Sequence, residues 1–147
     1  MDLDACGNWA NDDFGVCMKS DLAVSISEEL LQAILDGARR LYPKEMILLL
    51  RGKKTKTDLV VSELLVPPLA TYGRGFAGIR VHMLPMDFSI VGTVHSHPSG
   101  NVTPSPADLN HFFGSILMIV GFPFTNESNA AVYNCDGEKL VLHVVKS

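Results

Sequence analysis

Two histidines in the second half of the chain have the type and spacing to bind a metal ion. The run from Phe88 to Val94 is short, apolar and rich in β-branched residues, which predicts a buried strand ending at the histidines. Side chains two apart on a strand point to the same face, so His95 and His97 would project together while Ser96 points away. Pro98 cannot donate a hydrogen bond to a neighbouring strand, so His97 is expected at the strand end.

A third donor follows at the start of a predicted helix. The segment Ser105-Pro106-Ala107-Asp108 has serine at the N-cap, proline at the first helical position and aspartate at the third. This pattern is also a variant of the capping box, which needs no metal to explain it. A carboxylate at a helix N-terminus stays ionised, and with two neutral imidazoles it makes a three-ligand set. Zinc with three protein ligands keeps its fourth position for water, which is typical of catalytic sites.

Such a site needs a base to take the proton of the water, so a further carboxylate is expected nearby. Glu45 is the first candidate, because a carboxylate beside the apolar run Met46 to Leu50 is costly without a proton or a charged partner. Glu63 is the alternative, although alternation along Val60 to Val66 favours a solvent-facing position for it.

These separated residues together carry a resemblance to a known family. The pattern consists of Glu45, then His95-Ser96-His97-Pro98, then seven residues between His97 and Ser105, then Ser105-Pro106-Ala107-Asp108. It resembles the signature of the JAMM (MPN-plus) zinc metalloprotease family, most of all its short archaeal members, and extends over roughly residues 22–146. One position departs from the pattern: many members have glycine three residues after the glutamate, where this chain has Leu48.

The resemblance implies a role for each matching residue. His95, His97 and Asp108 would bind one zinc ion per chain. Glu45 would act as general base and acid through the zinc-bound water, and Ser105 would hydrogen-bond the developing oxyanion.

The resemblance also implies a fold and a substrate class. The fold would be α+β and MPN-like, with a mixed β-sheet core flanked by an N-terminal amphipathic helix and a helix following the metal-binding loop. The bond cleaved would follow the C-terminal Gly-Gly tail of ubiquitin or a ubiquitin-like modifier joined to a lysine, and the tail could add as a strand to an exposed sheet edge. The short stretch from Gly114 to Asn134 lacks room for the second-zinc insertion of some chain-specific deubiquitinases, so broad or ubiquitin-like-specific activity is expected.

The segment Gly73 to Gly78 has the formal glycine spacing of a dinucleotide-binding loop. A nucleotide is not predicted there, because Pro67-Pro68 separates the segment from the preceding strand and no helical pattern follows. A flexible loop is the simpler interpretation. By the resemblance, Gly73, Gly75 and Gly78 would help seat the substrate tail, since glycine lets one backbone approach another.

The remaining pattern predicts an irregular extension over residues 1–20 and a single catalytic domain over residues 21–147. In the first half, the pattern predicts a strand at 22–26, a helix capped by Ser25 with Glu28 and ending at Pro43, and strands at 45–51 and 58–66 around a turn at 52–56. A further strand is expected at 79–85. In the second half, it predicts a helix after Ser105 with Leu109, Phe112 and Phe113 on its apolar face, a buried strand at 116–121, and a hairpin of 130–135 and 140–145. A type I′ turn is expected at Asp136-Gly137.

Composition limits the partners and the compartment. A formal charge of −4 leaves no basic field, so nucleic acid is not expected, and 47% hydrophobic residues are typical of a globular protein. Neither a secretory signal nor a membrane span is predicted. Three cysteines, Cys6, Cys17 and Cys135, at unrelated spacings favour a reducing, cytoplasmic location, with Cys135 in the core. The oligomeric state is not predictable from the sequence.

Several alternatives compete with an isopeptidase. An amidohydrolase barrel also uses His-x-His but needs more than about 200 residues. A non-catalytic MPN scaffold in a larger complex and a processing peptidase for a sulfur-carrier protein remain open. Metal storage is disfavoured by the open ligand position. His111 lies three residues after Asp108, where it could orient a ligand, although an exposed helix histidine is the simpler interpretation.

Overall fold

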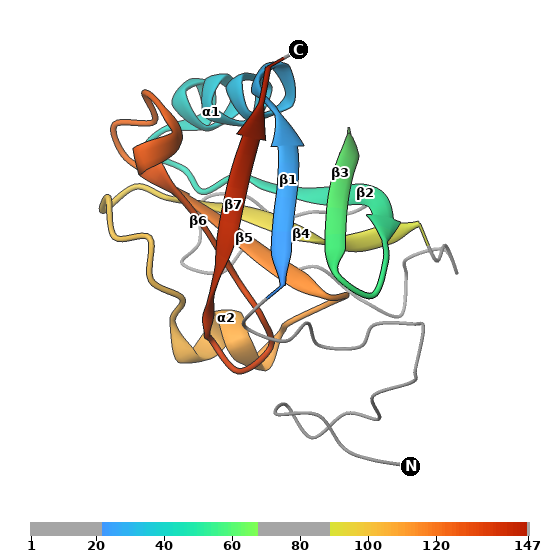
Figure 1. Cartoon of the computed structure of the whole chain (residues 1–147). Helices are drawn as coiled ribbons and strands as arrows, with labels where there is room; N and C mark the ends of the chain where they lie inside the picture. Colours follow the sequence, from blue (N-terminus) through green and yellow to red (C-terminus); the bar gives the residue numbers. More distant parts are fainter. Residues whose placement is uncertain (1–21, 68–88, 147) are drawn as a thin grey trace.

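The strands of the described residues form one mixed sheet that closes on itself (Figure 1). The computed structural model describes residues 22–67 and 89–146. In chain order, the elements are β1 (Ala23–Ser27), α1 (Glu28–Leu41), β2 (Ile47–Lys54), β3 (Asp58–Leu65), β4 (Ile90–His97), α2 (Pro106–Asn110), β5 (Ile116–Gly121), the 3-10 helix η2 (Glu127–Asn129), β6 (Ala130–Tyr133) and β7 (Lys139–Val145). The α+β class with a mixed sheet is therefore confirmed.

The strand order around the barrel is β1-β3-β2-β4-β5-β6-β7. β1 pairs in parallel with both β3 and β7, and β4 pairs in parallel with β5, whereas the other neighbours are antiparallel. Closure occurs because the first and last of the described strands lie side by side. Among the described strands, β6 and β7 pair only at Val132–Leu140 and Tyr133–Lys139, and the binding of a substrate strand to a sheet edge stays a prediction.

Helix α1 buries one face against the barrel interior. Its apolar residues recur at helical spacing, and four of them are buried with inward-facing residues of the strands: Leu31, Ile34, Leu35 and Ala38. The N-cap is Ser27, whose side chain accepts from the Leu30 N–H at 3.1 Å. The prediction of Ser25 as the cap was wrong, because β1 continues through Ser27 and the chain turns two residues later.

The second strand starts later than expected. β2 begins at Ile47 and runs to Lys54, so Glu45 precedes the strand and the turn to β3 is formed by residues 55–57. β4 lies at the centre of the sheet, between β2 and β5, and approaches β5 closely at Gly92. A Cβ atom at Gly92 would meet the Ile116 carbonyl oxygen at 2.1 Å, so only glycine fits there.

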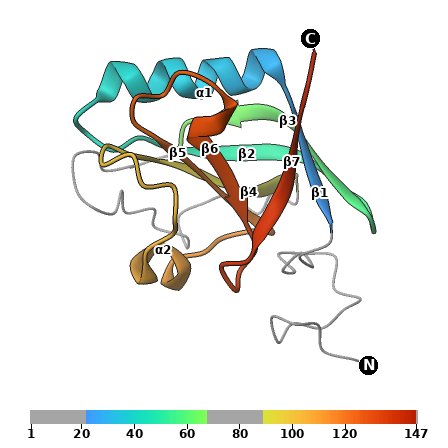
Figure 2. The same ribbon diagram turned by 60° about the vertical axis from the view of Figure 1, so that its left-hand side comes forward.

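The segment after β4 covers the outer face of β5 and β6. Val102 and Phe112 pack on a second apolar cluster that includes Leu117 and Ile119, and the Tyr133 hydroxyl donates to the Val102 carbonyl at 2.6 Å. These contacts explain why β5 is buried along its whole length, as predicted. Helices α1 and α2 consequently lie on opposite sides of the barrel (Figures 1 and 2).

Three local predictions in the C-terminal half need correction. Helix α2 ends at Asn110, so Phe112 follows the helix and does not extend its apolar face. The β6–β7 loop is not a two-residue type I′ turn: Gly137 N–H donates to the Asn134 carbonyl, and only Gly137 in this loop has a positive φ, of 80°. Cys135, expected as a reduced core residue, is half-buried and disulfide-bonded.

Other predictions lie outside the described residues. They concern the extension over residues 1–20, Cys6 and Cys17, Gly73, Gly75 and Gly78, and the strand at 79–85 with His82. Within the part of the chain that the structure describes, no helix combines the length and apolar character needed to cross a membrane.

Candidate metal centre

The end of β4 brings the two histidines to one carboxylate. His95 Nδ1 lies 3.4 Å from Asp108 Oδ1, and His97 Nε2 lies 3.3 Å from Asp108 Oδ2. Both rings therefore project to the same side of the strand, as the period of two predicts. Ser96, between them, is fully buried and faces the other way, toward β2.

Asp108 is held in place by the start of α2. Its backbone N–H donates to Ser105 Oγ at 3.1 Å, and its Oδ2 accepts from the Ser105 N–H at 2.8 Å. The two bonds make the predicted capping box, with Pro106 at the first helical position. Ser105 Oγ acts as the acceptor in its bond, so the proton of this hydroxyl is not used there. The helix cap and the carboxylate that faces both histidines are thus one arrangement and not two competing interpretations.

The charges at this cluster favour an ionised aspartate. Burial raises the pKa of Asp108, but hydrogen bonds from His95, His97 and the Ser105 backbone outweigh it and hold the pKa well below its usual range. Burial lowers the pKa of His97, whereas its bonds to Asp108 and to the Asn101 carbonyl raise it, and the net shift is upward. His97 Nδ1 lies 2.8 Å from the Asn101 oxygen, so Nδ1–H donates there and Nε2 faces Asp108.

The three side chains have the donor types that zinc prefers, and the two histidine–aspartate separations are compatible with shared ligation. At ligand distances of about 2.0–2.2 Å, two donors of a tetrahedral zinc site lie about 3.3–3.6 Å apart. The two histidine–aspartate distances, 3.4 and 3.3 Å, have this value. As they stand, however, the histidines face different oxygens, and among residues 22–67 and 89–146 no group of three or more His, Cys, Asp or Glu side chains is arranged to hold a metal.

One oxygen of the buried Asp108 carboxylate, Oδ1, is poorly satisfied. This oxygen lies 3.4 Å from His95 Nδ1, a long contact that does not make a well-formed hydrogen bond, and Asp108 is only 2% exposed. A buried carboxylate oxygen without a donor is costly, and a cation at this position would remove the cost.

Glu45 lies on the chain between α1 and β2, half-buried beside the cluster. Burial raises its pKa, the charge of His97 lowers it and the charge of Asp108 raises it, with a net pKa of about 7. The carboxylate is therefore within electrostatic reach of both residues. Glu63, the alternative base, is exposed and lies 3.5 Å from the Arg51 guanidinium, so the structure does not bring it to the site.

Ser96 has a positioning role that the sequence analysis missed. Its Oγ accepts from the Met46 N–H at 2.7 Å, and its own N–H donates to the Met46 carbonyl at 3.0 Å. The side chain thereby takes the Met46 N–H, which in a continuing antiparallel ladder would bond to a backbone carbonyl. Regular pairing ends here, and the preceding residue, Glu45, leaves the sheet beside the histidines. The available signal was a serine inside a buried strand, because such a hydroxyl must find a partner.

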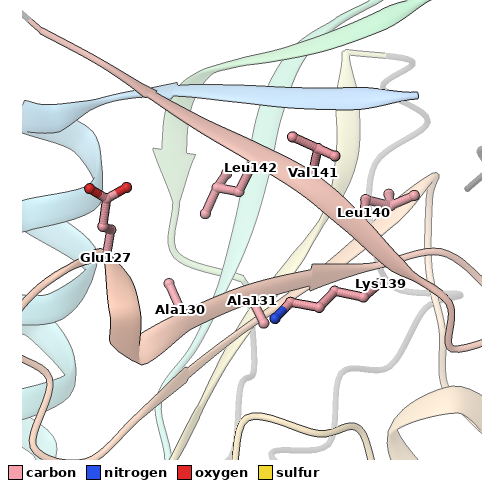
Figure 3. Close-up of a pocket in the computed structure, with 7 residues that line it drawn as sticks. All are labelled: Glu127, Ala130, Ala131, Lys139, Leu140, Val141 and Leu142. Atoms are coloured by element: carbon pink, nitrogen blue, oxygen red, sulfur yellow. The ribbon is translucent and has the colours of Figure 1, made fainter. Parts of the chain in front are cut away.

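Two other features lie apart from the cluster. His111 is exposed at the end of α2, with Nδ1 2.9 Å from the Ala107 carbonyl oxygen. A cavity of about 420 Å³ opens between β6 and β7 (Figure 3). Its lining residues are Glu127, Ala130, Ala131, Lys139, Leu140, Val141 and Leu142, and none of them belongs to the cluster.

Comparison with known proteins identifies the family. Residues 27–135 match the family described as prokaryotic homologs of the JAB domain. The chain belongs to this family, the JAMM family. A probable metalloprotease of Haloferax volcanii is 33% identical over 113 residues, which cover 72% of this chain and 70% of the relative.

Solved structures of other proteins share the fold. A JAB1/MPN domain protein from Archaeoglobus fulgidus is 37% identical, with a TM-score of 0.63 over 82% of this chain and 98% of that one. A structure described as JAMM, a metalloprotease-like zinc site in the proteasome and signalosome, is 36% identical, with a TM-score of 0.60 over 88% and 99%. A protein of Desulfitobacterium hafniense, 18% identical with a TM-score of 0.67 over 84% and 94%, shares the fold alone.

Proposed function

We propose that this JAMM-family protein is a zinc-dependent isopeptidase that cleaves the bond after the C-terminal Gly-Gly tail of ubiquitin or a ubiquitin-like modifier. The observation that carries the proposal is one buried carboxylate, Asp108, which faces both His95 and His97. Glu45, whose pKa is raised to about 7, lies beside them. A three-donor set with a separate acid–base group is typical of catalytic zinc sites.

The residues that would hold the metal are the three of the cluster, His95, His97 and Asp108. A zinc ion bound by His95, His97 and Asp108 would polarise the scissile carbonyl and make water a nucleophile at neutral pH. The Asn101 carbonyl orients the His97 ring so that Nε2 is the donor. The low pKa of Asp108 keeps its carboxylate ionised over the working pH range.

Glu45 would move the proton. A carboxylate with a pKa of about 7 can accept a proton from the attacking water and then donate it to the nitrogen of the leaving amine. Burial, which raises this pKa, favours the protonated form that donates to the leaving group. The Ser105 hydroxyl, whose oxygen already accepts from the Asp108 N–H, would donate to the oxyanion that forms at the carbonyl.

A single set of variants tests this proposal. Purified protein should carry about one zinc per chain and cleave a lysine-linked ubiquitin-like conjugate. Glu45→Gln should keep the zinc and lose cleavage, whereas His97→Ala should lose both. Glu63→Gln is the matched control, because Glu63 is an exposed glutamate paired with Arg51, and it should behave as the wild type.

The outcomes separate the proposal from its alternatives. Full cleavage by Glu45→Gln would remove the acid–base role, and activity in metal-free protein would remove the zinc mechanism. Cleavage of a peptide extension after Gly-Gly, without cleavage of a lysine conjugate, would indicate a processing peptidase for a sulfur-carrier protein. Zinc-loaded wild-type protein that cleaves neither substrate would indicate a non-catalytic scaffold.

A further inference from the structure

Two exposed aromatic rings lie in contact at the surface. Tyr42 is 45% exposed and Phe122 is 46% exposed, and their ring centroids are 4.8 Å apart with an interplanar angle of 31°. Beneath them lies the buried ring of Phe124, at 6.3 Å from Tyr42 and 6.0 Å from Phe122, in edge-on geometry. We call Tyr42 and Phe122 the aromatic platform. Packing within the barrel does not require either ring to face solvent.

The backbone connects the aromatic platform to the candidate metal centre at two places. The Phe122 N–H donates to the His97 carbonyl at 3.2 Å, so its backbone contacts a ligand residue. Tyr42 ends α1, and Glu45 follows three residues later, at most about 10 Å along the chain. The end of α1 and the end of β4 lie on the same side of the molecule in Figures 1 and 2.

The backbone beside the rings is held by hydrogen bonds, and the two rings pack on each other and on Phe124. The Phe124 N–H donates to the Gly121 carbonyl at 3.0 Å, and the Arg39 guanidinium on α1 donates to the Phe124 carbonyl. The Tyr42 N–H donates to the Ala38 carbonyl at 3.0 Å. Rigid aromatic rings lose little conformational entropy on binding, so such a surface is suited to recognition.

We propose that the aromatic platform binds the aliphatic stem of the lysine whose ε-nitrogen is the leaving group. This inference rests on the proposed function. The general acid must lie next to the nitrogen that it protonates, so the leaving group lies on the side of Glu45, which is also the side of Tyr42.

The chemistry of the two substrate halves supports this side. The acyl half ends in two glycines, which have no side chains to place on aromatic rings. The lysine half has four methylene groups, and while its nitrogen is part of an amide the side chain carries no charge. Such a stem lies favourably along an apolar surface. Recognition of the lysine stem would favour isopeptide over α-peptide bonds.

The test uses two substrates that differ only in the leaving group. Both carry the same Gly-Gly tail, joined either to the ε-nitrogen of lysine in a short peptide or to the α-nitrogen of glycinamide. Tyr42→Ala and Phe122→Ala should lower kcat/KM for the lysine-linked substrate by about fivefold to tenfold, mainly through KM, given the partial burial of four methylene groups. The glycinamide substrate should change less than about twofold.

Matched variants control for folding and for the ring itself. Val60→Ala removes an exposed apolar side chain from β3, away from the cluster, and should leave both substrates unchanged. Tyr42→Phe keeps the ring and should keep the lysine preference. Equal losses on both substrates, or no loss on either, would overturn the assignment of the aromatic platform while leaving the isopeptidase proposal intact.

A binding measurement tests whether the aromatic platform binds the lysine stem, independently of turnover and of variant stability. Wild-type protein is titrated with Nα,Nε-diacetyl-lysine methylamide, and the ring-proton NMR signals of Tyr42 and Phe122 are followed. Selective shifts of these signals, absent with N-acetyl-alanine methylamide, are expected. Unchanged ring signals would overturn the inference. If the wild type cleaves neither substrate, the proposed function fails, and the titration still decides whether the aromatic platform binds the lysine stem.

Discussion

Replacement of Ser96 by alanine should reduce catalysis without removing the zinc. Ser96 Oγ accepts from the buried Met46 N–H at 2.7 Å, and its own N–H donates to the Met46 carbonyl. Alanine would leave the Met46 N–H without a partner, which costs about 1–3 kcal/mol in the free energy of unfolding. The histidine side chains project from the opposite face of β4, so the ligand set should remain in place.

The effect on activity follows from the position of Glu45. Once Met46 is released, the carboxylate of Glu45 should become more solvated, so the burial that raises its pKa should weaken and the pKa should fall. Glu45 would then be a weaker base for the proton of the attacking water. We expect kcat to fall about tenfold or more, with KM nearly unchanged, and the acid limb of the pH–kcat profile to move to lower pH.

The assay combines zinc content, urea denaturation and the pH dependence of kcat. Ser96→Thr keeps the hydroxyl and should restore most of kcat and the pH profile. Ser62→Ala is the matched control, because Ser62 is exposed on β3 and donates to the Arg51 carbonyl at 3.3 Å, so it should change stability by less than about 0.5 kcal/mol. Loss of stability in Ser96→Ala with an unchanged kcat and pH profile would refute the positioning role, and loss of zinc would refute the separation of the two faces.

Three further predictions concern stability and metal binding. In metal-free protein the raised pKa of Glu45 means that the folded state binds more protons between about pH 4.5 and 7, so stability should fall over that range and then level off. Glu45→Gln should remove this fall and be more stable than the wild type at pH 8. The difference should be only on the order of 1 kcal/mol, because solvent screens the half-buried group. Equal dependence of stability on pH in the two proteins, measured by urea denaturation, would contradict this. Asp108→Asn should lose zinc and about 2 kcal/mol of stability at pH 7. Because the pKa of Asp108 is lowered, the difference in stability between wild type and variant should shrink as the pH falls below about 4. Urea denaturation of both proteins at pH 7 and below about pH 4 checks this. Gly92→Ala should destabilise the barrel by about 3 kcal/mol, because the new Cβ would lie 2.1 Å from a backbone oxygen of β5. Gly37→Ala on α1 is the control, because its Cβ would meet only a flexible methionine sulfur at 3.1 Å. Thermal unfolding of both variants measures the difference.

The sequence by itself determined the local parts of the candidate site. The period of two along a strand predicts that His95 and His97 share a face, and the pattern from Ser105 to Asp108 predicts the helix cap that holds the aspartate. Both depend on residues within a few positions of one another, so the chemistry of neighbouring residues is sufficient. The buried strand at 116–121 was equally clear, since an uninterrupted apolar run has one plausible environment in a sheet.

Only the tertiary structure decided how these parts meet. The bond from Met46 to Ser96 joins residues fifty positions apart and brings Glu45 to the histidines, whereas the sequence left Glu63 as an alternative. The closure of the barrel depends on the pairing of β1 with β7, which lie at opposite ends of the described chain. Contact between Tyr42 and Phe122 arose in the same way, from the end of a helix and a loop far along the chain. Such pairings depend on the whole set of strand neighbours, and no periodicity within a segment specifies them.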